Sequence, residues 1–200
     1  MSNRLEQLND ALSDVAAAVR ASLVQVHNGQ RGHGAGTIWH PNGLILTNAH
    51  VAANRNLRVT LADGRTFPAH LLARDPGLDL AALAIDASDL PAIELGRSQQ
   101  LRPGEWVLAL GHPWGQIGAA TGGVVIDPCA DLPEMETGRE WLTVSLHLRP
   151  GHSGGPLIDA QGRLVGINTM MNGPDVGVAV PVHVVKRFLR ESLERETARV

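Results

Sequence analysis

The sequence is poor in several residue types, and each shortage limits what the protein can be. Its 200 residues include a single cysteine, Cys129, so no disulfide can form within the chain, which fits a reducing compartment. With no histidine partner beside it, Cys129 is interpreted as a structural or loop thiol and not as a nucleophile. There is no tyrosine, and aromatic residues make up 3%, so the core has to be built from aliphatic side chains.

Charge of one sign and long apolar runs are also missing. The formal net charge is −3, with no long basic or acidic stretch, so neither nucleic acid nor an anionic membrane is expected as the main partner. No apolar run reaches the length that spans a bilayer, so membrane insertion is not expected. The first 20 residues carry Arg4, Glu6 and Asp10 and lack the apolar centre of a secretory signal. A cytoplasmic location is therefore expected, although export would also be compatible with these residues.

What the sequence does contain is short β-rich runs divided by turns. Glycine (22) and proline (12) are plentiful, and strand-like runs recur without helical periodicity between them. This pattern predicts an antiparallel all-β fold, either a barrel or a sandwich. The clearest runs are LVQVH (23–27), GLILTN (43–48), LAALAI (80–85), WVLALG (106–111), WLTVSLHL (141–148) and LVGINTM (164–170).

Two amphipathic segments flank the β-rich region. Residues 4–20 place leucine and valine at steps of three and four, which predicts a helix that either packs on the β-structure or forms an oligomer contact. Residues 181–196 predict a closing helix. The polar, strand-poor segment 96–104 divides the rest, so the expected parts are a helix at 1–21, an N-terminal half at 22–98 and a C-terminal half at 99–200.

The stretch GHSGG (151–155) fits two kinds of serine hydrolase. It matches the nucleophile turn of a trypsin-like protease and also the G-x-S-x-G elbow of an α/β-hydrolase. An elbow serine leads into a helix, whereas Ser153 is followed by PLIDAQGRLVGINT, which predicts a hairpin. Only 47 residues follow Ser153, too few for the remaining βα units. The trypsin-like interpretation is therefore favoured.

Upstream motifs supply the rest of a trypsin-like order. His50 lies in LTNAHV (46–51) and Asp79 in DPGLDLA (75–81), so histidine, aspartate and serine occur in the order of that class. Asp79 is flanked by apolar residues, and a buried carboxylate needs a partner. Taken singly, His50 fits a strand-end histidine and Ser153 a turn residue, but all three stand in their motifs.

Together these motifs resemble the HtrA/Deg serine proteases of the chymotrypsin fold. The resemblance covers residues 22–190 or so and rests on several ordered motifs. They are GAGTIWHPNGLILTNAHV (34–51), DPGLDLAAL (75–83), LRPGEWVLALGHPWG (101–115), RPGHSGGPLID (149–159), GRLVGINTM (162–170) and GVAVPVHVVKRFL (177–189).

The resemblance implies a fold and a mechanism. The fold would be two antiparallel six-stranded β-barrels with a helix at each end, the site lying between them. Ser153 would be the nucleophile, His50 its general base and Asp79 the residue that orients the imidazole, while the backbone N–H groups of Gly151 and Ser153 would form the oxyanion hole. The expected reaction is endoproteolysis of unfolded or misfolded polypeptide through an acyl-enzyme, with no cofactor and no metal.

The resemblance also implies a substrate-binding region. No aspartate stands at the expected pocket base, so an apolar P1 residue is favoured, although a histidine there could also accept an acidic one. The residues expected to bind substrate are His147, Leu148, Thr169, Met170, Met171 and Gly177. The methionine strand would pair with the substrate backbone by β-augmentation.

The chain departs from the family in two respects. His152 precedes the serine where HtrA-like chains usually carry asparagine, so its protonation could modulate the order of the loop, or it could be an exposed turn residue. No PDZ segment follows the closing helix, so a protease domain without a PDZ domain is expected, and a homotrimer is possible. The alternative function is a latent or chaperone-like peptide-binding module that retains the triad.

Overall fold

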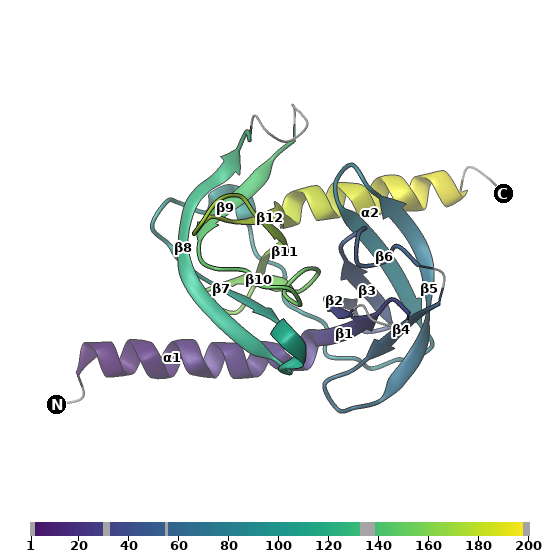
Figure 1. Cartoon of the computed structure of the whole chain (residues 1–200), viewed down its shortest axis with the longest axis horizontal. Coiled ribbons are helices and arrows are strands. Elements are labelled where there is room, and N and C mark those ends of the chain that lie inside the picture. Colours follow the sequence, from purple (N-terminus) through teal and green to yellow (C-terminus); the bar gives the residue numbers. More distant parts are fainter. Residues whose placement is uncertain (1–2, 30–32, 55, 133–138, 198–200) are drawn as a thin grey trace.

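The computed structural model describes residues 3–29, 33–54, 56–132 and 139–197, and it contains two closed antiparallel β-barrels. Each barrel has six strands, and the barrels lie side by side, with one helix at each end of the chain (Figure 1). The predicted all-β, chymotrypsin-like architecture is confirmed. The boundary at residues 98 and 99 stays a prediction; the short 3-10 helix Ser98–Gln100 lies in the segment that joins the barrels.

The first barrel closes in the order β1-β2-β3-β6-β5-β4. Its strands are β1 (Leu23–His27), β2 (His33–His40), β3 (Leu44–Thr47), β4 (Leu57–Thr60), β5 (Thr66–Asp75) and β6 (Leu80–Ile85). Side chains alternate across a strand, so every second residue of β1 and β4 enters the barrel. Val24, Val26, Val59, Ile45 and Leu83 meet there as a fully buried aliphatic core.

The second barrel closes in the order β10-β11-β12-β9-β8-β7. Its strands are β7 (Trp106–Gly111), β8 (Ala119–Ala130), β9 (Trp141–Ser145), β10 (Pro156–Asp159), β11 (Leu164–Met171) and β12 (Gly177–Pro181). The hairpin predicted after Ser153 is present as β10 and β11, which pair antiparallel. The interior of this barrel is again aliphatic, as the shortage of aromatic residues requires, and includes Val107, Val144 and Leu157.

Both predicted helices form within a residue of their expected ends. Helix α1 (Arg4–Val19) is capped by Asn3, whose side chain accepts a hydrogen bond from the N–H of Leu5. The second half of the helix packs on the core through Leu12 and Val15. Its first half extends away from the barrels (Figure 1), leaving Leu5 71% exposed. The structure thus shows the packing role for half of the helix, and the oligomer contact stays a prediction. Helix α2 is Val182–Thr197.

A third apolar cluster joins the barrels. Leu46 and Leu80 from the first barrel pack in the same cluster as Leu110 and Ile158 from the second, and Phe188 of α2 joins them. Burying one such side chain contributes about 1.5–3 kcal/mol, so the contact between the barrels is a stable surface on which a site can be fixed. Among the described residues, no helix is long and apolar enough to cross a membrane.

Candidate active site

The segment DPGLD fixes the orientation of Asp79. The Asp75 carboxylate accepts a hydrogen bond from the N–H of Leu78 at 3.0 Å, which closes a turn just before β6. Asp79 then takes a φ of +52°, an uncommon conformation for a residue with a side chain. The Asn48 side-chain amide donates to the Asp79 carbonyl at 2.9 Å and supports this backbone. The Asp79 side chain is consequently only 13% exposed.

His50 follows β3 and meets Asp79 through two kinds of hydrogen bond. Its backbone N–H donates to Asp79 Oδ1 at 3.1 Å, and its Nδ1 lies 3.0 Å from Oδ1 and 2.9 Å from Oδ2. These contacts place the proton of a neutral imidazole on Nδ1 and leave Nε2 as the base. The His50 side chain is 52% exposed, so substrate can reach it.

Asp79 is held in its charged form. Burial alone would raise its pKa, but hydrogen bonds from His50 and Thr169 and the attraction of His50 outweigh burial and lower the pKa below its ordinary value. A carboxylate that stays ionised can orient the imidazole and stabilise an imidazolium.

Thr169 has a role that the sequence did not indicate. Its contact with the substrate backbone stays a prediction; in the structure its hydroxyl donates to Asp79 Oδ2, and its carbonyl accepts from the Ser153 hydroxyl at 2.9 Å. Thr169 lies on β11 of the second barrel, while Asp79 belongs to the first, so this residue ties the two barrels together at the site. A buried threonine in a strand carries no local signal of such a contact.

The nucleophile turn contains two glycines, Gly151 and Gly154, at positions where a side chain would clash. Gly151 has a φ of +106°, and an added Cβ would lie 2.3 Å from the His112 carbonyl oxygen. Gly154 has a φ of +85°, and its Cβ would lie 2.1 Å from the carbonyl oxygen of Ala35 on β2. Ala35 in turn donates its N–H to the Ser153 carbonyl at 2.8 Å. The first barrel therefore clamps the turn that carries Ser153.

Two backbone N–H groups at this turn are available to an oxyanion. Within the described parts of the chain, neither the N–H of Gly151 nor that of Ser153 donates a hydrogen bond. The carbonyls of the same segment face elsewhere: Gly151 accepts from His112 at 2.8 Å and Pro150 accepts from Trp114 at 3.3 Å. Free donors with no carbonyl competing for them are what an oxyanion hole needs.

The Ser153 hydroxyl occupies a resting orientation. It donates to the Thr169 carbonyl, and it makes no hydrogen bond to His50 in the described structure. Proton transfer to Nε2 of His50 therefore requires the hydroxyl to turn away from Thr169. Catalytic hydrogen bonds are often long or misaligned without substrate, so this orientation is compatible with catalysis.

The residues expected to bind substrate differ in their exposure and in their contacts. Leu148 is buried, and its N–H contacts the Met171 sulfur at 3.1 Å, while Met170 is exposed beside it on β11. His147 is exposed and lies 3.7 Å from the Asp175 carboxylate. A Cβ at Gly177 would contact Leu146 at 3.0 Å, so this glycine allows β12 to pack closely.

Two further expectations concern His152 and Cys129. His152 is 1% exposed, so the interpretation as an exposed turn residue is wrong: its ring is packed under the nucleophile turn. Cys129 is an exposed residue of β8 whose thiol contacts Glu140. Partial burial and the Glu140 charge raise its pKa, which disfavours a reactive thiolate. The described residues contain no cluster of metal-binding side chains.

Comparison with known proteins gives consistent matches. Residues 34–167 match the trypsin-like peptidase domain family. The serine protease HTRA2, mitochondrial, of Drosophila pseudoobscura pseudoobscura is 40% identical over 171 residues, covering 82% of this chain and 40% of the relative. The protein of that name from Drosophila ananassae is 36% identical over 214 residues, covering 98% of this chain and 50% of the relative. A solved structure of the HtrA-type protease AlgW with a tripeptide superimposes with a TM-score of 0.87 at 30% identity, covering 92% of this chain and 64% of that one.

The two barrels, the His-Asp pair and the serine turn, together with the family match, define the class: the chain belongs to the trypsin-like peptidase family. Within that family its relatives are HtrA-type serine proteases, as the sequence motifs predicted. The chain spans about two fifths to half the length of these curated relatives. Their names place them in mitochondria, and the cytoplasmic location expected for this chain stays a prediction.

Proposed function

We propose that this protein is a serine endopeptidase that cleaves unfolded polypeptides through an acyl-enzyme on Ser153. His50 Nε2 takes the hydroxyl proton and returns it to the leaving amine, and Asp79 orients the ring. The N–H groups of Gly151 and Ser153 stabilise the oxyanion. The observation that carries the proposal is the His50–Asp79 pair, with two oxygens within 3.0 Å of Nδ1, beside a turn with two free N–H donors.

The preferred P1 residue is apolar and of small or medium size. The buried Leu148 and the Met171 sulfur in contact with it supply an apolar lining. The alternative, an acidic P1 residue, requires a free imidazole at His147, and that ring already faces the Asp175 carboxylate. Peptide is the class of ligand named for the AlgW structure, and we extend it to this chain.

A second candidate function is a latent enzyme or a chaperone-like peptide-binding module. The resting orientation of Ser153, directed at the Thr169 carbonyl, favours it. The free donors at Gly151 and Ser153 favour an active enzyme, because catalysis needs preorganised N–H groups that are available to the developing charge.

The test is degradation of reduced, unfolded casein by the wild type and by Ser153→Ala, together with labelling by a fluorophosphonate probe. Cleavage and labelling that are both lost in Ser153→Ala would establish the enzyme, and sequencing of the fragment ends would establish the P1 preference. A wild type that binds casein without cleaving it or reacting with the probe would instead support the latent module.

A further inference from the structure

Two buried imidazoles lie behind the nucleophile turn and are unused by the proposed chemistry. His152 immediately precedes Ser153 and is 1% exposed, while His112, just after β7, is 4% exposed. In the described part of the chain, the Nε2 atom of each ring is buried and has no hydrogen-bond partner. Buried polar atoms without partners are rare and costly, so their retention at this place calls for a function.

His152 closes the loop that contains the oxyanion donors. Its Nδ1 accepts a hydrogen bond from the N–H of Arg149 at 3.1 Å, and its own backbone N–H donates to the Arg149 carbonyl at 2.9 Å. Pro150 and Gly151 lie inside the turn that these two bonds close. The position of the Gly151 N–H therefore depends on the His152 ring.

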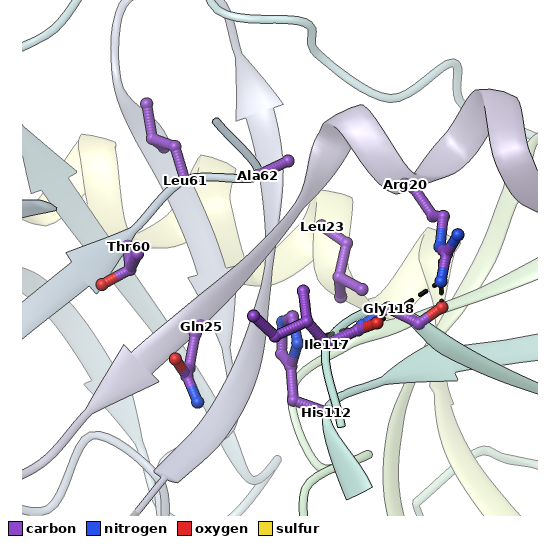
Figure 2. A pocket seen from close by; sticks show the side chains of 9 residues that line it. All are labelled: Arg20, Leu23, Gln25, Thr60, Leu61, Ala62, His112, Ile117 and Gly118. Atoms are coloured by element: carbon purple, nitrogen blue, oxygen red, sulfur yellow. Dashed lines mark hydrogen bonds between the residues drawn. The ribbon is translucent and has the colours of Figure 1, made fainter. Parts of the chain in front are cut away.

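His112 holds the same loop from the other side. Its backbone N–H donates to the Gly151 carbonyl, and its Nδ1 accepts from the N–H of Gly118 at 3.3 Å. Figure 2 shows His112 on the wall of a cavity of about 350 Å³, near Gly118 and Leu23. Arg20 of the helical N-terminal segment donates to the carbonyls of Ile117 and Gly118 there. The cavity gives water a route toward this ring.

The Nδ1 of His112 accepts from the N–H of Gly118. The Nδ1 of His152 lies 3.1 Å from both the N–H and the carbonyl oxygen of Arg149, and it accepts from the N–H only while that nitrogen is unprotonated. Protonation would leave the N–H groups of Arg149 and Gly118 without partners and would place a charge in a buried site. The groups that face the rings cannot neutralise such a charge. The charge of Arg149 acts on His152, His27 of β1 and His152 act on His112, and Arg20 lines the adjoining cavity.

The electrostatics agree with this geometry. Burial lowers the pKa of His112, and the nearby His27 and His152 lower it further, although the Val24 carbonyl opposes the shift. Burial also lowers the pKa of His152, and the Arg149 charge adds to this effect, while a hydrogen bond to the Arg149 backbone opposes it. Both rings are therefore neutral in the folded protein at neutral pH.

We propose that His112 and His152 are positioning residues that hold the oxyanion loop (149–153) in its catalytic shape only while both rings are neutral, so that acidification opens the loop and switches the enzyme off. This inference rests on the proposed endopeptidase function. It adds a proton-dependent step at two residues that take no part in the proton transfers of that reaction.

The proposal predicts the steepness of the acidic limb. Above the ordinary histidine pKa of 6.5 the rings are neutral in both the closed and the opened loop, so pH has no effect through them. Below pH 6.5 the two rings bind protons in the opened loop but stay neutral in the closed loop. Because the opened form binds more protons, its population rises as the pH falls. Two protons change the ratio of the two forms up to about 100-fold per pH unit. The logarithm of kcat/KM should therefore fall with a slope well above 1.

The first experiment measures kcat/KM on a fluorogenic peptide from pH 8 to pH 5 for the wild type and five variants. His152→Ala removes the acceptor for Arg149 and should lower kcat at pH 8 by about tenfold, the effect of one lost buried hydrogen bond. His152→Asn and His112→Asn retain an acceptor oxygen at the position of Nδ1 but do not titrate. They should restore kcat at pH 8, and the double variant should give a clearly shallower slope than the wild type. The matched control is His70→Asn, an exposed histidine on β5, which should keep the wild-type slope.

The second experiment does not need activity. In the Ser153→Ala chain, the ring C–H resonances of His112 and His152 are followed by NMR from pH 8 to pH 4.5, together with the amide of Gly151. Rings that stay neutral to well below pH 6.5, and a Gly151 amide that moves with their protonation, support the proposal. Rings that titrate at 6.5 without moving Gly151, or a double variant as steep as the wild type, would overturn it. A wild type that neither cleaves nor reacts with the probe would refute the proposed function alone.

Discussion

Two clusters in this molecule contain the same three kinds of side chain. One joins Ser153, His50 and Asp79 at the junction of the barrels. The other joins Ser98, whose hydroxyl lies 2.8 Å from Nδ1 of His183, to Glu140, whose carboxylate lies 2.8 Å from Nε2 of the same ring. The second cluster has the more complete chain of hydrogen bonds, because its serine contacts its histidine and Ser153 does not.

The difference lies in what surrounds each serine. Ser98 is 1% exposed and accepts a hydrogen bond from the backbone N–H of His183, which satisfies the first turn of α2. Ser153 stands in a turn with two free N–H donors, and Thr169 links it to Asp79, the partner of the exposed His50. Serine, histidine and acid in a hydrogen-bonded row are therefore not enough: access and a place for the oxyanion separate a catalytic cluster from a structural one.

The largest expected contrast comes from removing the two hydroxyls. Ser153→Ala should reduce turnover on the order of 10⁶-fold, because the nucleophile is gone. Ser98→Ala should leave turnover intact and lower the free energy of unfolding by about 1 kcal/mol, because α2 loses a capping acceptor. Peptide hydrolysis by both variants measures the turnover, and urea denaturation measures the free energy of unfolding. Equal losses of turnover would mean that the clusters had been wrongly distinguished.

The two acids give the next contrast. Asp79→Asn should lower kcat by about 10⁴-fold, since the amide favours the wrong tautomer of His50. Glu140→Gln should change kcat by less than about twofold, because its partner His183 serves the fold. The kcat of each variant is measured with saturating peptide substrate at pH 8. A loss of activity in Glu140→Gln with an unchanged melting temperature would contradict this assignment.

Thr169 sharpens the comparison, since the Ser98 cluster has no hydroxyl that supports its acid in this way among the described contacts. Thr169→Val keeps the shape of the side chain and removes the hydrogen bond to Asp79. Loss of a hydrogen bond to a charged group costs about 1.5–3 kcal/mol, so kcat should fall by roughly 10- to 100-fold. Thr169→Ser should recover most of it. An unchanged kcat in Thr169→Val would remove Thr169 from the set of functional residues.

Acid stability distinguishes the same carboxylates. The folded protein lowers the pKa of Asp79, so the stability from this group is present above its unfolded value of 3.8 and is lost as pH falls toward the folded value. The pKa of Glu140 is lowered too, by its hydrogen bond to His183 and the charges of His183 and Arg187, but that side chain is more exposed. Urea midpoints between pH 5 and pH 2.5 should fall less steeply in Asp79→Asn than in the wild type. Glu140→Gln should show a smaller flattening.

The smallest expected effect concerns Cys129, at the edge of the structural cluster. Its pKa is raised by partial burial and by Glu140, so alkylation by iodoacetamide at pH 8 should be slow. In Glu140→Gln the rate should rise a few-fold, roughly in proportion to the thiolate fraction. Activity should stay constant during labelling; a parallel loss would make the thiol part of the active site.

The strands, both helices and the position of the serine turn could be predicted because each has a local signature. Alternating aliphatic residues bounded by turns define the strands, and segments such as HPNG and DAQG predict turns. The conformation of Gly151 was likewise predictable, since a turn that presents backbone N–H groups needs a left-handed residue there.

Other features depend on contacts between residues far apart in the sequence. Thr169 reaches Asp79 across 90 positions, and His183 reaches Ser98 across 85. The burial of His152 follows from the packing of the neighbouring β7 end: a Cβ on Gly111 would meet its backbone at 2.6 Å. No periodicity in the sequence indicates such contacts, so neither the burial of His152 nor the hydrogen bond from Thr169 to Asp79 could be predicted from it.

The clamp that β2 places on the serine turn bears on how the protein is made. The barrel that carries His50 and Asp79 leaves the ribosome first, and the turn with Ser153 leaves much later. Because the Ser153 carbonyl is held by Ala35 and the Gly154 carbonyl by Thr37, the turn reaches its final shape only when the second barrel has docked. In a chain whose second barrel has not yet docked, these two hydrogen bonds are missing, so the turn that carries Ser153 lacks the contacts that fix its shape.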